Sequence, residues 1–227
     1  MKLISSWSGG KDSCLALYKA LQKGEEVCLL LNFISEEYQR CCFHGLASEL
    51  MIQQAQALDI PIRQVAVPAD MQEYEKKFKL TVNHLMEKEK IQGMIFGDVY
   101  LEEHKSWVDR VCQELKIIPI QPLWNIPAEK VVAEFVAAGF RALVVSAKAD
   151  LFDQDFLGRQ VDYELIKELT DRKICPCGEN GEFHTFVYDG PIFKKKISIK
   201  KTEKILKAGF WKHWFLDIRD YAIEKSA

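Results

Sequence analysis

The first half of the chain alternates short apolar runs with longer amphipathic stretches, and this alternation restricts the possible folds more than any other feature. The apolar runs predict strands at Lys2–Trp7, Val27–Phe33, Ile62–Val67, Met94–Val99 and Ile117–Ile120. The helical spacing between them predicts helices at Ser13–Lys23, Ala47–Leu58, Tyr74–Lys90 and Glu103–Leu115. Strands that alternate with helices are typical of a parallel sheet covered on both faces. We therefore expect an α/β fold with helices on both faces of a parallel sheet.

A dense proline cluster divides this part of the chain from the rest. It lies in the stretch PIQPLWNIP, residues 119–127. Such clusters mark loops and boundaries, so we predict one domain over 1–125 and a smaller α+β domain over 126–227. In the second domain we expect two helices and two strands, at Ala128–Ala138, Phe140–Ala147, Tyr163–Arg172 and Phe183–Tyr188. The last forty residues have the pattern of strands or mixed structure.

The composition excludes several classes of protein. The 227 residues carry 31 basic and 33 acidic side chains, for a net charge of −2, so nothing favours nucleic acid or an anionic membrane as a stable partner. Apolar runs such as Val27–Phe33 are far shorter than the ~20 residues of a membrane-spanning helix. The lysines of 194–196 and 200–201 fit a solvated strand face. The seven cysteines, mostly in apolar patterns, indicate a reducing compartment, and we expect a soluble cytoplasmic protein without a signal peptide.

A polar hexad, SGGKDS at residues 8–13, follows the first predicted strand. Its two glycines can adopt positive φ and leave room for an anion beside the backbone. The following helix presents unpaired N–H groups there, Lys11 adds a positive charge, and the two serines add hydroxyl donors. Asp12 fits such a site if it caps backbone N–H groups or faces Mg²⁺. A plain strand–turn–helix is the alternative, and we favour a phosphate site.

A second polar group lies in CPCGENGEFHTFVYDGP, residues 175–191. Glu182 and His184 are two residues apart, so they project to one side of an extended chain, with Thr185 opposite. A carboxylate and an imidazole together suit substrate binding or proton transfer, although a polar loop before a strand remains the alternative. Cys175 and Cys177 with His184 could also suggest zinc. Their spacing is not Cys-x-x-Cys and no second pair follows, which disfavours a zinc site.

These motifs resemble those of a known family. The hexad resembles the pyrophosphate loop of the ATP pyrophosphatase superfamily, and the stretch 177–186 together with it resembles the diphthine–ammonia ligase family. Further matching stretches occur in order at Phe43–Gly45, Gly97–Val99, Pro122–Trp124 and Leu157–Arg159. The resemblance implies a HUP-type, Rossmann-like nucleotide domain followed by a smaller family-specific domain. It also implies that ATP with Mg²⁺ adenylates a carboxylate in the cleft between them, and that ammonium amidates it with release of AMP and pyrophosphate.

The resemblance also implies roles for individual residues. The catalytic residues would be Lys11, Asp12, Glu182 and His184. The nucleotide would be bound by Ser8, Gly9, Gly10, Lys11, Asp12, Ser13, Asn32, Phe33, His44, Gly97 and Asp98. The substrate would be bound by His104, Arg159, Glu179, Asn180, Gly181, Glu182, His184 and Thr185. Magnesium would contact Asp12.

Three of these roles have alternatives. His44 is either a nucleotide or substrate contact or a plain capping histidine. Asp98 either orients Mg²⁺ or a ribose, or caps a helix. Arg159 has a guanidinium that could bind a carboxylate or a phosphate through two hydrogen bonds.

The chain departs from the family pattern after Gly97–Val99. Diphthamide-pathway members tend to show Ser-x-Tyr-Gln-x-x-Arg there, whereas this chain has His104 in place of the glutamine and Trp107 in place of the arginine. The change is expected near the nucleotide and substrate cleft, so it bears on the acceptor rather than on ATP. A modified elongation factor 2 is the expected acceptor where diphthamide is made, and a different small-molecule carboxylate is the alternative.

Two other functions were weighed. A regulatory module that binds ATP or AMP without chemistry would have no use for the acid, base and hydroxyl of Glu182–Thr185. An enzyme of tRNA modification shares the loop, but the sequence has no evident basic or zinc-ribbon appendage for tRNA. We therefore favour the ligase, and we expect it to be a homodimer.

Overall fold

The computed structural model describes residues 1–42, 44–208 and 212–225. A five-stranded parallel sheet has the order β3-β2-β1-β4-β5. Its strands are β1 (Lys2–Ser6), β2 (Glu26–Ser35), β3 (Ile62–Val67), β4 (Gly93–Ile95) and β5 (Ile118–Ile120). The strand order reverses between β1 and β4, and ligands of such sheets bind beyond the carboxyl ends of the strands at this switch point.

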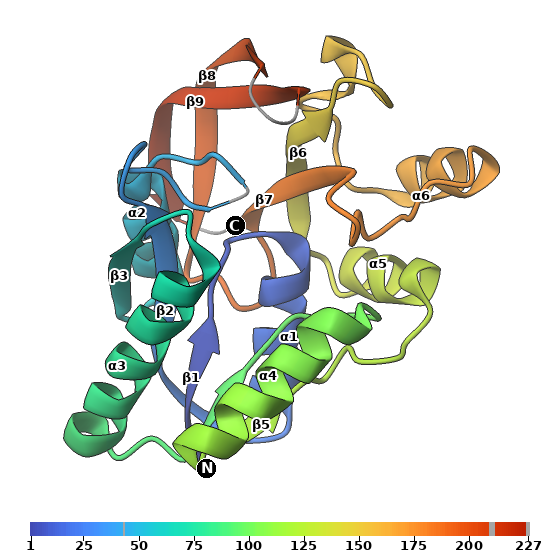
Figure 1. Ribbon diagram of the computed structural model, residues 1–227. Coiled ribbons are helices and arrows are strands. Elements are labelled where there is room, and N and C mark those ends of the chain that lie inside the picture. The colour runs from blue at the N-terminus through green and yellow to red at the C-terminus, as the bar shows by residue number, and fades with distance from the viewer. Residues whose placement is uncertain (43, 209–211, 226–227) are drawn as a thin grey trace.

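Helices cover both faces of this sheet, as Figure 1 shows. They are α1 (Lys11–Gln22), α2 (Ser48–Leu58), α3 (Met71–Glu89) and α4 (Glu102–Leu115). Successive strand residues point to opposite faces: Leu3 and Leu30 pack in the apolar cluster of α1 and α2, whereas Ile4 and Leu31 pack in that of α3 and α4. The predicted α/β fold is thus confirmed.

A second sheet follows in the chain. Its order is β7-β6-β9-β8 and its paired neighbours are antiparallel. The elements of this part are α5 (Ala128–Ala137), β6 (Arg141–Lys148), the 3₁₀ turn η1 (Gln154–Phe156), α6 (Tyr163–Asp171), β7 (Phe183–Asp189), β8 (Lys195–Ala208) and β9 (Lys212–Lys225). In Figure 1 it lies on the side of the parallel sheet toward which β1 points. One buried apolar cluster includes residues of both sheets, and the boundary at 125 stays a prediction.

Two boundaries differ instructively from the sequence-based expectation. The strand expected at Met94–Val99 ends at Ile95, because the next residues turn toward α1. A Cβ on Gly97 would lie 3.0 Å from the backbone N of Ser13, so the chain passes too close to α1 for a larger residue. Helix α3 begins at Met71 rather than at Tyr74, because Asp70 caps it by accepting from the N–H groups of the second and third helical residues, both at 3.0 Å.

The last part of the chain, expected as strands or mixed structure, is the long hairpin of β8 and β9. Lysines on β8 pair with carboxylates: Lys200 Nζ lies 2.9 Å from Glu224, and Lys204 Nζ lies 2.9 Å from Asp155. Exposed, paired lysines are what a solvated strand face would show. Among the described residues, no helix is both long and apolar enough to span a membrane.

Candidate active site

The hexad forms the bend between β1 and α1. Gly9 adopts φ +75°, a conformation that favours glycine, and Gly10 is the N-cap residue of α1. The Ser13 hydroxyl donates to the Gly10 carbonyl at 3.0 Å, and the Ser8 hydroxyl donates to Ser13 Oγ at 3.2 Å. The bend therefore presents the first turn of α1, with its backbone N–H groups and partial positive charge, to a ligand.

Strand β7 of the second sheet lies directly on this bend. The Lys11 N–H donates to Thr185 Oγ1 at 3.0 Å, and the Val187 N–H donates to the Gly9 carbonyl at 3.0 Å. Gln54, fully buried on α2, donates to the carbonyls of Gly9 and Val187 at 3.0 and 2.7 Å. The loop of one sheet is thus held by a strand of the other. Gln54 belongs to no motif and is not among the residues predicted from the sequence.

Lys11 lies inside the site with its side chain only 3% exposed. Its ammonium donates to Asp12 Oδ2 at 2.9 Å and to the Cys177 carbonyl. Burial by itself lowers the pKa of Lys11, but the Asp12 carboxylate together with Cys177 and Glu179 outweighs this and the pKa is raised. The side chain therefore keeps its positive charge beside the start of α1.

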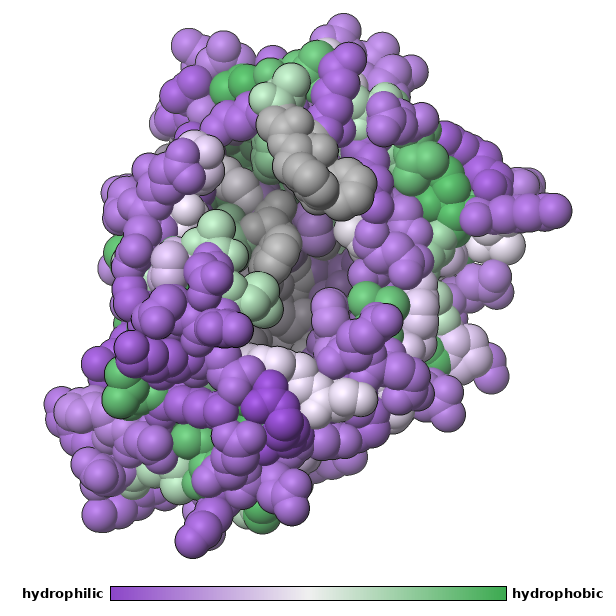
Figure 2. All heavy atoms as spheres, in the orientation of Figure 1, coloured by the Kyte–Doolittle hydropathy of each residue, from purple (hydrophilic) through white to green (hydrophobic). Residues whose placement is uncertain are grey.

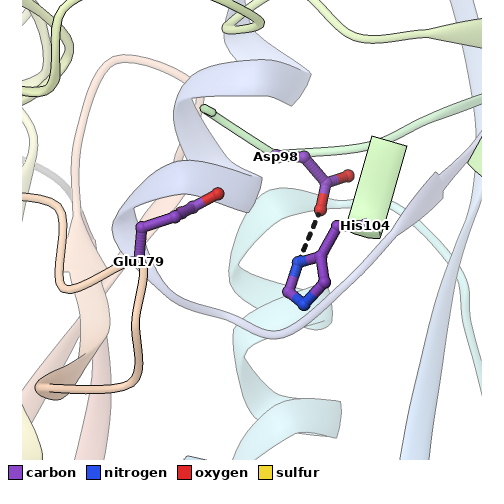
Figure 3. Close-up of side chains that lie close together, drawn as sticks. All are labelled: Asp98, His104 and Glu179. Carbon is purple, nitrogen blue, oxygen red and sulfur yellow. Dashed lines mark ion pairs between the residues drawn. The ribbon is translucent and has the colours of Figure 1, made fainter. Parts of the chain in front are cut away.

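Three titratable side chains from different segments of the chain lie close together near α1, as Figure 3 shows. Asp98 Oδ1 lies 3.3 Å from His104 Nδ1, and Glu179 Oε1 accepts from the N–H of Val99 at 2.9 Å. Ligand atoms of all three lie within 4.8 Å of one another. The hydrogen bond that His104 donates to Asp98 raises the pKa of His104, and burial raises that of Glu179. We call Asp98, His104 and Glu179 the acidic cluster.

The residues at this place fit a divalent cation. Carboxylate oxygens are the ligands that Mg²⁺ prefers. Besides the acidic cluster, Asp12 Oδ1 is a buried oxygen with no hydrogen-bond partner among the described residues. Burial raises the pKa of Asp12, and an adjacent cation would offset that cost.

Two histidines meet beside the bend on the β7 side. The rings of His44 and His184 lie 4.6 Å apart between centroids, and His44 Nδ1 lies 3.0 Å from the Thr185 carbonyl. A Cβ on Gly10 would lie 2.6 Å from His44 Cε1, so the imidazole packs on the loop itself. Burial lowers the pKa of His44 to about 4 and lowers that of His184 as well. Both rings are therefore neutral at pH 7.

The segment before β7 does not place Glu182 as expected. Strand β7 begins at Phe183, so the alternation of a strand does not extend to Glu182. Its carboxylate accepts from the N–H and the side-chain amide of Asn180 at 2.9 and 3.1 Å, and that amide also donates to Tyr100 at 3.0 Å. Within the described residues no hydrogen bond joins Glu182 to His184. Gly181 adopts φ +74° in this turn.

Two expected nucleotide contacts have protein partners instead. Asn32 is fully buried, donates to the Trp7 carbonyl at 2.8 Å and accepts from Gln64 at 3.1 Å. The ring of Phe33 is stacked on Phe78 at 5.6 Å in the core, so it does not offer a face to adenine. Phe43, part of a matching stretch, lies outside the described residues.

Arg159 and Trp107 also lie elsewhere. Arg159 pairs with Glu168 of α6 and lines a cavity of about 260 Å³ with residues of η1 and α6. The Trp107 indole donates to Glu75 of α3 at 2.8 Å and packs edge-on against Phe78. The substitution at position 107 therefore belongs to the contact between α3 and α4. Of the two departures from the family pattern, His104 and Trp107, only His104 lies in the acidic cluster.

The cysteines of the second motif do not form a metal centre with His184. The Cys177 thiol donates to the Ala128 carbonyl at 3.4 Å, while the ring of His184 lies beside that of His44. Among the described residues, the group with metal-binding geometry is the acidic cluster.

Figure 2 shows that the surface is hollowed near the centre of this view, in the region where β7 and the start of α1 lie in Figure 1.

The fold and the bend after β1 define an α/β protein whose loop at the start of α1 is covered by a strand of a second sheet. Family models give the more specific assignment. The diphthamide synthase N-terminal domain matches residues 1–119, and the diphthamide synthase C-terminal domain matches residues 127–226. The chain therefore belongs to the diphthamide synthase family.

Curated relatives agree with the family. The chain is similar to the diphthine–ammonia ligase of Danio rerio, at 26% identity over 91% of this chain and 89% of the relative. It is also similar to the diphthine–ammonia ligase of Homo sapiens, at 26% identity over 91% and 85% of the two chains. A solved structure of a predicted subunit of tRNA methyltransferase from Methanocaldococcus jannaschii aligns at a TM-score of 0.45 and 17% identity, over 82% of this chain and 96% of that one.

Proposed function

We propose that this protein is an ATP-dependent ligase that adenylates a carboxylate and amidates it with ammonia, releasing AMP and pyrophosphate. The observation that carries the proposal is the start of α1, where backbone N–H groups and the buried, charged Lys11 lie beside the acidic cluster. The family assignment and the name of the relatives, diphthine–ammonia ligase, support the same reaction.

The site would bind the pyrophosphate end of ATP at the bend. The N–H groups of the first turn of α1 and the Lys11 ammonium would receive phosphate oxygens. Thr185 Oγ1, which accepts from the Lys11 N–H at 3.0 Å, can donate its own hydrogen to a phosphate. Asp12, Asp98 and Glu179 would hold Mg²⁺, whose charge neutralises the phosphates.

The chemistry follows from this placement. A carboxylate oxygen of the acceptor attacks the α-phosphorus and the α–β bridge breaks, so the departing pyrophosphate gains negative charge at the end that lies against the bend. Donors already oriented there stabilise the developing charge without reorganising. The acyl adenylate is a good substrate for ammonia, because AMP leaves far more readily than an oxide ion. The result is an amide.

The acceptor proposed first is the carboxylate of diphthine, which the name of the relatives contains, carried on elongation factor 2. His104 stands where the family tends to have glutamine and lies in the acidic cluster. A small-molecule carboxylate is therefore the second candidate. The two share one chemistry and differ only in what carries the carboxylate.

The test supplies ATP, MgCl₂ and ammonium chloride with elongation factor 2 that carries diphthine, and measures nucleotide products and the mass of the acceptor. Formation of AMP, pyrophosphate and amide in equal amounts supports the proposal. Formation of ADP would contradict cleavage between the α and β phosphates. ATP binding with no turnover on this acceptor or on a panel of small carboxylates would favour a nucleotide-binding regulator. Reactions without ammonium are the control.

Three further expectations remain predictions: a division into domains at residue 125, a homodimer and a cytoplasmic location. Proteolysis with mass mapping tests the first, analytical ultracentrifugation the second, and cell fractionation of the untagged protein the third. A small enzyme of this kind is most often a symmetric pair, and the expected sedimenting species has twice the chain mass of 26.2 kDa.

A further inference from the structure

The hydrogen bond of His44 determines which of its ring nitrogens is basic. Nδ1 lies 3.0 Å from the carbonyl oxygen of Thr185. A carbonyl can only accept, so Nδ1 must carry a hydrogen and donate it. In a neutral imidazole this leaves Nε2 without a hydrogen, as an acceptor. The fold thus selects one tautomer of His44 by a backbone contact.

The position of this acceptor is also fixed. His44 Cε1, the ring atom bonded to Nε2, lies so near the loop that a Cβ on Gly10 would be 2.6 Å away. The ring of His184 lies against the other side, with centroids 4.6 Å apart. Both histidines are only partly buried, so a ligand at the bend can reach them.

The charges around His44 favour its neutral form. Lys11 faces it from α1 and lowers its pKa, although burial has the larger effect. His184 faces it from β7, and Lys11, His213 of β9 and Lys148 of β6 all act to lower the pKa of His184 in turn. Once Nε2 accepts a proton the ring is positively charged, and burial and Lys11 disfavour that form, so the proton passes on to solvent.

We propose that His44 Nε2 is the proton acceptor for the nitrogen that ammonia brings to the acyl adenylate. The inference rests on the proposed function and adds a role that the family assignment does not give. Ammonia attacks the acyl carbon with its lone pair, and the nitrogen becomes positively charged. Nε2 takes one proton from it, the bond from the acyl carbon to the AMP oxygen breaks, and AMP leaves with the electron pair. Amide, AMP and a transient imidazolium are the products of the step.

The other candidate bases fit this role less well. The Glu182 carboxylate already accepts two hydrogen bonds from Asn180. Lys11 keeps its proton, as the raised pKa shows. Glu179 lies in the acidic cluster, where a cation would be bound. The ring of His184 lies 4.6 Å from that of His44 between centroids, and no hydrogen bond within the described residues sets its tautomer, so it is a positioning residue here.

The first experiment reads the tautomer of the wild-type protein by ¹⁵N NMR of its imidazoles. A His44 signal with hydrogen on Nδ1 and none on Nε2 at pH 7 supports the proposal. Hydrogen on Nε2, or an imidazolium at pH 7, overturns it. The signal of His44 is assigned as the one that is absent from the spectrum of the His44→Asn variant. This readout needs no acceptor, so it tests the tautomer that the inference requires independently of the proposed function.

The second experiment separates adenylation from amidation. His44→Asn keeps a side-chain amide that can donate to Thr185 but removes the base at Nε2. With diphthine-bearing elongation factor 2, the variant should retain ATP–pyrophosphate exchange within about twofold and lose ~10²–10³ in amide formation from ammonium. Hydroxylamine, a stronger nucleophile that loses its extra proton far more readily, should restore turnover. His84→Asn, an exposed histidine of α3, is the control.

The outcomes are distinguishable. If the wild type gives no exchange and no amide, the proposed function or its acceptor is wrong, and this failure is recognised even when the NMR result shows the expected tautomer of His44. If the wild type is active and His44→Asn amidates normally, the inference is wrong and the proposed function stands. Equal loss of exchange and of amidation also overturns it, because His44 would then serve the nucleotide.

Discussion

The two sides of the α1 N-terminus use the same kinds of residue for opposite purposes. On the β7 side, His44 and His184 lie side by side near Lys11, with their rings tilted relative to each other. On the β4 side, His104 lies against Asp98 and close to Glu179. The first side is neutral to positive and suits phosphates. The second side is rich in carboxylates and suits a cation.

A comparison of His44 and His104, which both make a polar contact through Nδ1, explains the difference between the two sides. Burial lowers the pKa of His44 to about 4 and Lys11 adds to the fall, whereas the hydrogen bond that Nδ1 donates to an uncharged carbonyl opposes it only in part. His104 has a side chain 58% exposed and contacts a carboxylate, so its pKa rises. Burial without a counter-charge favours the neutral ring, and a carboxylate favours the charged one. The partner, rather than the residue type, decides what each histidine can do.

The largest effect is expected from Lys11→Ala, which removes the only full positive charge that the loop residues 8–13 supply. Loss of a preoriented donor to a developing charge costs ~10²–10³ in turnover. AMP formation under saturating ATP should fall by this factor while circular dichroism is unchanged. Lys19→Ala removes a lysine of the same helix that pairs with Glu134 and should keep wild-type turnover. Full activity of Lys11→Ala would show that the proposed phosphate-binding side of the α1 N-terminus does not depend on this charge.

Gln54→Leu tests how firmly β7 is held on the loop. The change removes the donor to Gly9 and Val187 and leaves the buried indole N–H of Trp7, now 2.9 Å from Gln54 Oε1, without an acceptor. Unsatisfied buried groups cost ~1–3 kcal/mol, so the free energy of unfolding in urea should fall by about 2 kcal/mol. Gln56→Leu on the exposed face of α2 is the control. Equal stability of both variants would mean that β7 is held by other contacts.

The parallel sheet could be predicted because each of its elements is encoded locally. Apolar runs and helical periods are visible within a few residues, and the hexad of the loop is contiguous. The predicted ends of elements were wrong where a tertiary contact determines them. Strand β4 ends at Ile95 because the chain around Gly97 lies against α1. No local pattern shows such an approach.

The site was only partly predictable for the same reason. The resemblance supplied candidates such as Asn32, Arg159 and Glu182, but chain order does not tell where a side chain points. Asn32 bonds within the core and Arg159 pairs with Glu168. Conversely, Gln54 has no motif, and its role follows only from the meeting of α2, β1 and β7. Its position on the apolar face of a helix is the signal in the sequence that could have suggested a role for Gln54.

Glu179→Gln sharpens the cation side of the comparison. The amide keeps an oxygen that can accept from Val99 but removes a negative charge from the acidic cluster. Changes around bound metals typically cost 10–100-fold in affinity, so the Mg²⁺ concentration for half-maximal AMP formation should rise ~10-fold, with the maximum rate approached at high Mg²⁺. Glu164→Gln, an exposed residue in the first turn of α6, should not change the requirement. An unaltered Mg²⁺ requirement would show that the cluster does not hold the cation.

The smallest effect is expected from the pair of His104 and Asp98. Because the pKa of His104 is raised in the folded protein, the pair contributes stability that is fully present below the unfolded value of ~6.5 and is lost as pH rises through the raised folded value. The side chain is 58% exposed, so screening limits the contribution to a few tenths of a kcal/mol, about the value of a surface pair. The difference in unfolding free energy between wild type and His104→Gln should therefore favour the wild type at pH 5.5 and shrink toward zero by pH 8.5. A difference that grows with pH would mean that His104 is neutral in the folded state, and the contrast with His44 would then be lost.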